Sequence, residues 1–240
     1  MKSNKYSSTY ISILYSSHII NFIIQSYCCA YSITPIRIIS KIFIMPLLFL
    51  IYISLTNKKN RSKLLMYGII FGWYGDIFML APSSSPLIIG GILSFLIGHL
   101  FYIIKTMKNS SVKVYQKNIH YIFLILILYS YISYFILNYV KEGFIKGNIL
   151  VPGVFYLAII GIFNASSFFN LITNFNISNF QICIGSMLFW TSDFILIRMM
   201  FYELLYYYHF IVMTTYMLAQ TLIVIGMSGA EKNTLKEVSN

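Results

Sequence analysis

The chain has 240 residues, of which 58% are hydrophobic and only 10% are charged, and its mean hydropathy is +0.76. Soluble domains carry about 25% charged residues, so this composition excludes a water-soluble enzyme, a nucleic-acid-binding protein and a disordered chain. The net charge of +11 comes from 17 basic and 6 acidic residues. Because the basic residues stand in short clusters between apolar stretches, we interpret them as signals of membrane topology.

Eight apolar segments are each long enough to cross a bilayer, since about 20 helical residues span its ~30 Å hydrocarbon core. In chain order the expected spans are residues 10–32, 35–56, 64–81, 86–106, 119–140, 149–171, 180–200 and 208–228. Polar or turn-forming residues separate them, at 57–61, 81–86, 108–111, 141–143 and 174–179. We therefore predict an all-α integral membrane protein, a single domain over residues 1–240 with about eight transmembrane helices and a short polar tail at 229–240.

The basic residues are divided unevenly between the two sides of this predicted bundle. Twelve lie on the side that both termini share: Lys2, Lys5, Lys58, Lys59, Arg61, Lys63, Lys105, Lys108, Lys113, Lys117, Lys232 and Lys236. Four lie on the other side: Arg37, Lys141, Lys146 and Arg198. The positive-inside rule then puts both termini in the cytoplasm. The expected membrane is a bacterial plasma membrane or the endoplasmic reticulum. The first segment lacks a small-x-small cleavage site, so we expect a retained span and not a signal peptide.

The two aspartates of the chain, Asp76 and Asp193, both fall inside predicted spans. An aspartate near the middle of a bilayer costs about 2.5–3.5 kcal/mol on insertion scales, and an intramembrane carboxylate favours a functional site. The alternative is that each aspartate only hydrogen-bonds a neighbouring helix. The glutamates are expected in loops or the tail: Glu142, Glu203, Glu231 and Glu237.

Four polar residues on four different spans share one depth, about 9–12 Å below the non-cytoplasmic surface at 1.5 Å per residue. They are Lys41, Asp76, Asp193 and Tyr216. His99 lies nearer the middle of its span, and Gln220 lies one turn from Tyr216. The alternatives are that Lys41 extends to the interface, that Tyr216 is a core aromatic and that His99 is structural. With two carboxylates at its level, we expect Lys41 to lie near them.

Small residues recur at helical spacing beside both aspartates: Gly68, Gly72 and Gly75; Gly91, Ser94 and Gly98; Gly185, Ser186 and Ser192. Small residues let membrane helices approach closely, which turns both aspartates toward the bundle interior. The aspartates also lie 193 − 76 = 117 residues apart, each three residues after a tryptophan, and the same offset pairs His99 with Tyr216. An even number of spans separates the matched positions, so this weak repeat describes two parallel four-helix halves.

Two carboxylates in a low-dielectric pocket cannot both ionise cheaply, and one lysine stabilises one of them as the anion. The result is a protonated acid beside an ionised base, which suits hydrolysis of an acid-labile C–O bond. No cofactor or metal is expected, because the histidines are scattered and no Cys–His spacing fits zinc. Three cysteines in apolar segments, Cys28, Cys29 and Cys183, are expected to be small buried hydrophobic residues.

Motifs around the two aspartates are spread over about residues 41–226, a range that is most of the chain. They are Gly75-Asp76-Ile77-Phe78-Met79-Leu80, residues 90–102 (GGILSFLIGHLFY), residues 185–193 (GSMLFWTSD), residues 216–220 and Lys41. Together they resemble the YhhN-like lysoplasmalogenase family. The resemblance implies an eight-span bundle that hydrolyses the vinyl ether of 1-alkenyl-glycerophosphocholine or -ethanolamine to a fatty aldehyde and glycerophosphocholine or glycerophosphoethanolamine.

Under this hypothesis Asp76 and Asp193 are the catalytic pair, one the general acid and the other an anion that Lys41 stabilises. We expect other polar residues to position the substrate or water: Tyr216, His99, Gln220, Ser192 and Tyr102. The partner would be a lysophospholipid-type amphiphile that enters from the outer leaflet. Proton-coupled carriers and lipid translocases also use paired intramembrane carboxylates. Against a carrier stand the mostly unbroken spans, which show no polar lining of substrate size. Against a non-catalytic scaffold stands the energetic cost of two buried aspartates.

Overall fold

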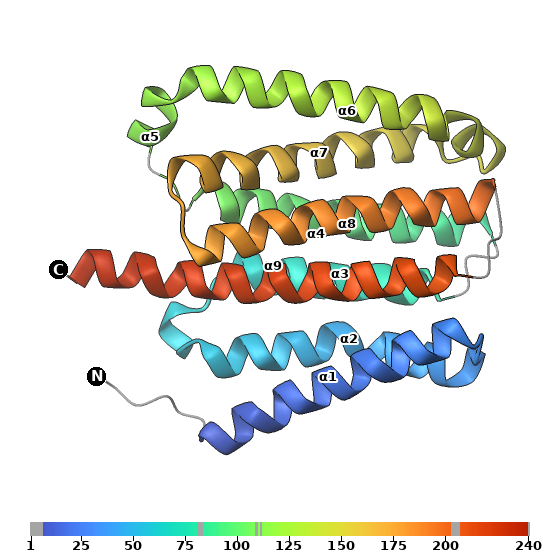
Figure 1. Ribbon diagram of the computed structural model, residues 1–240, viewed down its shortest axis with the longest axis horizontal. Helices are drawn as coiled ribbons and strands as arrows, with labels where there is room; N and C mark the ends of the chain where they lie inside the picture. Colours follow the sequence, from blue (N-terminus) through green and yellow to red (C-terminus); the bar gives the residue numbers. More distant parts are fainter. Residues whose placement is uncertain (1–6, 81–83, 109, 111, 203–206, 240) are drawn as a thin grey trace.

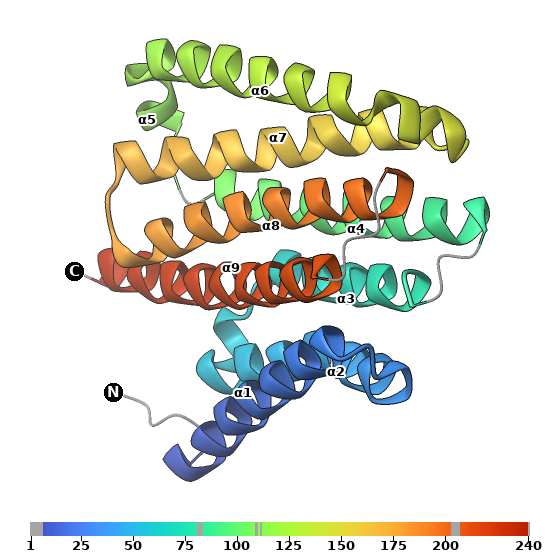
Figure 2. The ribbon, with the colours of Figure 1, turned by 45° about the vertical axis from the view of Figure 1, so that its right-hand side comes forward.

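In the computed structural model, the regular structure of the described residues is entirely helical, and the long helices run side by side along one axis (Figure 1). The structure describes residues 7–80, 84–108, 110, 112–202 and 207–239. The helices are α1 (Ser8–Ala30), α2 (Thr34–Leu55), the 3-10 turn η1 (Lys58–Asn60), α3 (Lys63–Phe78), α4 (Ser85–Met107), α5 (Val112–Lys117), α6 (Ile119–Lys146), α7 (Leu150–Thr173), α8 (Ile177–Phe201) and α9 (Tyr208–Ser239). α1 begins and α9 ends at the same end of the bundle (Figures 1 and 2).

Six of the helices within the described residues are long and apolar enough to cross a membrane: α2, α4, α6, α7, α8 and α9. The other two long helices, α1 and α3, complete the stack (Figure 2). The prediction of an all-α membrane bundle of about eight helices is confirmed. α6 continues through Lys146, so Glu142 lies in a helix and not in the expected loop. Lys2, Lys5, Glu203, residues 81–83 of the break at 81–86 and part of 108–111 lie outside the described residues, as do the side chains of Lys232, Lys236 and Glu237.

Small residues set the closest contacts between neighbouring helices. A Cβ atom added at Gly98 of α4 would lie 3.2 Å from the carbonyl oxygen of Gly68 on α3. A Cβ at Gly185 of α8 would lie 2.9 Å from the carbonyl oxygen of Ala219 on α9. Without a hydrophobic driving force inside lipid, such close van der Waals packing is what holds membrane helices together. These contacts join the two helix pairs that carry the aspartates.

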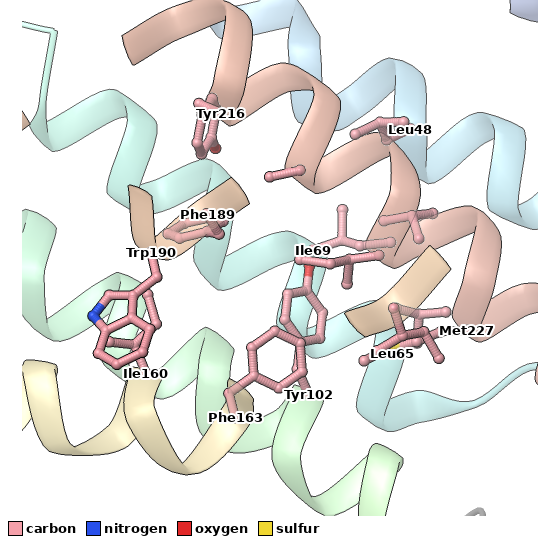
Figure 3. Close-up of a cluster of buried hydrophobic side chains, with 14 of the residues drawn as sticks. Leu48, Leu65, Ile69, Tyr102, Ile160, Phe163, Phe189, Trp190, Tyr216 and Met227 are labelled. Atoms are coloured by element: carbon pink, nitrogen blue, oxygen red, sulfur yellow. The ribbon is translucent and has the colours of Figure 1, made fainter. Parts of the chain in front are cut away.

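Aromatic and aliphatic side chains from all eight long helices form one buried cluster in the bundle, and Figure 3 shows part of it. Phe163 of α7 and Phe189 of α8 are fully buried, and Tyr102 of α4 packs against the Phe163 ring. The outward faces of α1 and α6 expose large apolar side chains such as Ile23 and Phe123, as a surface that faces lipid would. Cys28, Cys29 and Cys183 are free and buried, as expected.

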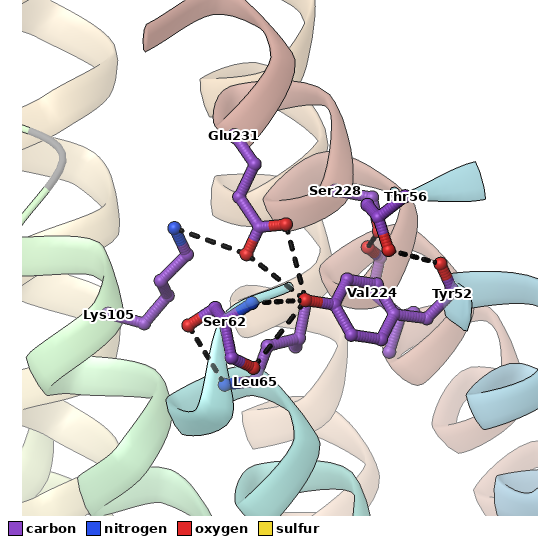
Figure 4. A network of polar contacts seen from close by, with 8 residues as sticks. All are labelled: Tyr52, Thr56, Ser62, Leu65, Lys105, Val224, Ser228 and Glu231. Carbon is purple, nitrogen blue, oxygen red and sulfur yellow. Dashed lines mark hydrogen bonds and ion pairs between the residues drawn. The ribbon is translucent and has the colours of Figure 1, made fainter. Parts of the chain in front are cut away.

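A polar network closes the end of the bundle where α4 and α9 pack beside the turn that joins α2 to α3 (Figure 4). The sequence favours a place in the tail for Glu231, but this residue lies in α9 and only 6% of it is exposed. Its carboxylate lies 3.4 Å from the Lys105 ammonium and accepts a hydrogen bond of 3.2 Å from the Tyr52 hydroxyl. The Ser62 amide in turn donates to Tyr52, so one buried charge ties α2, α3, α4 and α9 together.

Candidate functional site

At the opposite end of the bundle, an internal cavity of about 130 Å³ lies where α2 and α9 begin and α3 and α8 end. We call it the polar cavity. Its polar lining comes from Gln25, Arg37, Lys41, Asp76, Ser192, Asp193, His209 and Tyr216. Five of the eight residues proposed from the sequence therefore surround one cavity: Lys41, Asp76, Ser192, Asp193 and Tyr216.

Asp76 lies in the last turn of α3 and is 1% exposed. The Tyr216 hydroxyl of α9 donates a hydrogen bond of 2.7 Å to its Oδ2 atom. Gly75 lets α3 pass close to α4 beside this carboxyl, because a Cβ there would lie 2.8 Å from the Phe95 ring. The carboxyl group is thus held between three helices and aimed into the cavity.

Asp193 lies in α8 and is half-buried. The Tyr156 hydroxyl of α7 donates a hydrogen bond of 2.5 Å to its Oδ2 atom. The preceding residue, Ser192, donates from its hydroxyl to the Val212 carbonyl of α9 at 2.9 Å. This bond fixes the last turns of α8 against α9, and each aspartate therefore has a tyrosine hydroxyl from another helix as its hydrogen-bond donor.

Lys41 reaches the same cavity from α2, and its Nζ atom donates to the carbonyl of Met79 at 3.1 Å. Pro46 explains how α2 is fixed beside α3 at this level. A proline has no N–H to donate to the carbonyl four residues earlier, which here belongs to Ile42. The Trp73 indole N–H of α3 donates to that carbonyl instead, at 3.0 Å.

The other three residues proposed from the sequence lie outside the polar cavity. His99 is 2% exposed, its Nδ1 atom lies 2.7 Å from the Phe95 carbonyl oxygen, and its ring packs edge-on to Phe189. Tyr102 donates to the Gln220 side-chain oxygen at 3.3 Å, and both side chains are 1% exposed. These residues form a buried layer toward the centre of the bundle.

Sequence reasoning missed four polar residues that contribute to this site: Gln25, Arg37, Tyr156 and His209. Arg37 lies four residues before Lys41, and His209 lies seven before Tyr216. Helical spacing alone would therefore place Arg37 on the same face as Lys41, and His209 on the same face as Tyr216. Tyr156 is one of 21 tyrosines, and nothing in the sequence distinguishes it.

A second, apolar cavity of about 50 Å³ adjoins the polar one between α4, α6, α7 and α8. We call it the apolar cavity. Its walls include Ile88, Ile92, Phe144 and Ile197, and Asp193 and Tyr156 also line it. Both cavities share Met79, Phe95, Asp193, Leu196 and Met200. Asp193 therefore stands at the junction of a polar and an apolar space.

The chemical groups at this junction are two carboxyls, two phenolic hydroxyls, an ammonium and a serine hydroxyl. They are groups that hold and transfer protons. Within the described part of the chain, no three or more His, Cys, Asp or Glu side chains come together as a set of metal ligands.

These features define a multi-pass membrane protein in which two carboxyl groups line one cavity. The sequence pattern of the YhhN family matches residues 36–227, which is four fifths of the chain, and the chain belongs to this family. The resemblance of the motifs is thereby confirmed. The match includes both aspartates and Lys41, whereas α1 precedes it. Comparisons with curated proteins and with solved structures found no match.

Proposed function

We propose that the protein is a lysoplasmalogenase-like hydrolase, which cleaves the vinyl ether of a 1-alkenyl-glycerophospholipid that has lost its second chain. Membership of the YhhN family supports this class of activity. The observation that carries the proposal is the position of Asp193, which stands where a polar cavity with a second carboxylate and a lysine meets an apolar one. A substrate with a polar head, one reactive bond and one chain matches that sequence of environments.

A vinyl ether is activated by proton transfer to its β-carbon. In the proposed first step Asp193 gives its proton to this carbon, a C–H bond forms, and the positive charge resides on the oxocarbenium ion. We assign the proton to Asp193 because Lys41 donates a hydrogen bond to the carbonyl of Met79, three residues after Asp76, which places its ammonium group on the Asp76 side of the cavity. A neighbouring cation favours the ionised form of a carboxyl group, so Asp76 is the anion of the pair.

Water completes the reaction. The Asp76 carboxylate stabilises the oxocarbenium ion. It takes a proton from a water molecule while the oxygen of that water bonds to the α-carbon. In the resulting hemiacetal Asp76 gives its proton to the glycerol oxygen and Asp193 takes the proton of the hydroxyl group, so the bond between the α-carbon and the glycerol oxygen breaks and both carboxyl groups return to their starting states. The products are a fatty aldehyde and a glycerophospho-alcohol, and the sum of the steps consumes one water molecule.

The tyrosines serve as positioning residues in this scheme. Tyr216 holds the Asp76 carboxylate through a hydrogen bond of 2.7 Å, and Tyr156 holds Asp193 through one of 2.5 Å. With one oxygen of each carboxyl fixed, the other oxygen faces the reacting atoms. Preorganised donors of this kind are effective where water is largely excluded.

The proposed substrate enters laterally from the outer leaflet, with both termini of the protein in the cytoplasm. The test is aldehyde release by the detergent-purified full-length protein from three lysolipids that differ only in an alkenyl, a saturated alkyl or an acyl chain. The proposal predicts aldehyde from the alkenyl lipid and no cleavage of the alkyl lipid, which has no double bond to protonate. Intact alkenyl lipid after incubation with folded protein would contradict it.

A further inference from the structure

We infer that Arg37, Lys41 and His209 form a binding site for the phosphodiester of the substrate's head group in the polar cavity. This inference rests on the proposed function for the identity of the amphiphile. The site itself is argued from the positions, charges and hydrogen bonds of these three side chains.

The three groups come together from two helices. Arg37 and Lys41 are four residues apart on α2, so they lie on one face of that helix, and both line the polar cavity. His209 lies in the first turn of α9, and its Nδ1 atom accepts a hydrogen bond of 3.5 Å from the Arg37 guanidinium. That tautomer carries its proton on Nε2, which leaves a second donor for an anion.

Charge makes an anion the fitting ligand. Among the residues that the structure describes, Arg37 forms no ion pair with a carboxylate, whereas Lys41 adds its positive charge from beside Asp76. Arg37 and His209 are both half-buried, so solvent screens them only in part. A guanidinium matches a phosphate group with two parallel hydrogen bonds, and such charge-assisted bonds are the strong ones.

The groups that line the two cavities also fit one substrate pose. Arg37 and Lys41 line the polar cavity from α2, Asp76 lines it from α3, and Asp193 of α8 lines both this cavity and the apolar one. A lysophospholipid has its reactive bond between a phosphate-bearing head and a hydrocarbon chain, which matches cations in the polar cavity, carboxyl groups beside them and an apolar space next to Asp193. The bound phosphate would also offset the repulsion between Arg37 and the oxocarbenium ion.

Binding of two uncleavable amphiphiles to the full-length protein in detergent tests the inference. The probes are a 1-O-hexadecyl-glycerophosphoethanolamine, which has no vinyl ether, and 1-O-hexadecylglycerol, which lacks the phosphate. We expect Arg37→Gln to weaken binding of the first probe about tenfold, the effect of one charge-assisted hydrogen bond. Arg37→Gln should leave binding of the second probe unchanged. His209→Ala should weaken binding of the first probe by a smaller factor and should also leave binding of the second unchanged. Arg198→Gln, a half-buried arginine near the same end of α8 that does not line the cavity, is the matched control.

The outcomes separate this inference from the proposed function. Equal affinity of the wild type for both probes, or an equal loss on both probes in Arg37→Gln, would overturn the phosphate site even if aldehyde is released. Loss confined to the phosphate-bearing probe supports the site even if no vinyl ether is cleaved. Soluble glycerol 3-phosphate is the third probe. Weak binding of glycerol 3-phosphate that depends on Arg37 supports a head-group site. Binding of glycerol 3-phosphate as tight as that of the phosphate-bearing amphiphile would contradict a lipid as the ligand of this site.

Discussion

The Tyr216 hydroxyl of α9 lies 2.7 Å from the Asp76 carboxylate of α3, although 140 residues separate the two in the sequence. Hydrogen bonds to charged groups contribute about 1.5–3 kcal/mol. This bond therefore fixes the orientation of a carboxylate that would otherwise rotate within the cavity. It also makes the geometry of the site depend on how α9 packs against the rest of the bundle.

Replacing Tyr216 with phenylalanine tests this dependence. Tyr216→Phe removes the donor while the ring still fills its place among buried aromatic side chains. We expect kcat for aldehyde release to fall about tenfold or more, in line with the loss of one hydrogen bond to a charged group. KM should change little, because the bond does not reach the substrate. Tyr131→Phe, at a tyrosine that is 69% exposed on α6, should leave kcat unchanged, and an equal fall in both variants would contradict the assigned role.

The proline in α2 leads to a prediction about coupling. Trp73→Phe removes the donor to the Ile42 carbonyl that Pro46 leaves unpaired, and we expect a loss of about 1 kcal/mol in the free energy of unfolding. In a Pro46→Ala background the backbone gains an N–H that can bond to that carbonyl, so the same tryptophan substitution should cost less. A double-mutant cycle of unfolding in detergent measures the difference. Identical losses in the two backgrounds would show that the carbonyl is not what Trp73 stabilises.

Close packing of α8 on α9 leads to a prediction about stability. At Gly185 a Cβ would lie 2.9 Å from the Ala219 carbonyl oxygen and 3.1 Å from the Ile223 amide nitrogen, and backbone atoms cannot move aside singly. We expect Gly185→Ala to lower the free energy of unfolding by about 1–3 kcal/mol through overpacking. Gly161→Ala is the control, since its Cβ would approach only the rotatable Ser133 hydroxyl, at 2.9 Å. Equal stability of the two variants would be inconsistent with a close contact at Gly185.

The buried ion pair at the other end of the bundle should matter for stability and not for chemistry. Glu231→Gln leaves the Lys105 ammonium, 12% exposed, without its 3.4 Å partner. Breaking a buried pair in this way costs about 3 kcal/mol, and the variant should unfold at a lower temperature with its kcat retained. Lys108→Gln changes an exposed lysine on the same turn and should have no effect. A large fall in kcat at temperatures where Glu231→Gln is folded would contradict a purely structural role.

The sequence identifies the long helices well because apolar length and polar breaks are local properties. Asp76, Asp193 and Lys41 can be found for a related reason, since charged groups are rare in these spans, and Tyr216 can be found because its depth, counted along its helix, matches theirs. The true position of Glu231 cannot be found in this way, because its partners, Lys105 and Tyr52, come from distant helices. His99 does not line the polar cavity, because depth alone does not tell which face of a helix looks into a cavity.

Hydrolysis by single aspartate variants is the most direct test of the central claim. Aldehyde release from a defined lysoplasmalogen should be followed for the purified wild type, Asp76→Asn and Asp193→Asn, with Glu142→Gln as a control at an exposed carboxylate. The account predicts that Glu142→Gln keeps wild-type turnover, while each aspartate variant stays folded and loses at least about 100-fold, the effect of removing a general acid or base. Near wild-type turnover in either Asp76→Asn or Asp193→Asn would contradict the account.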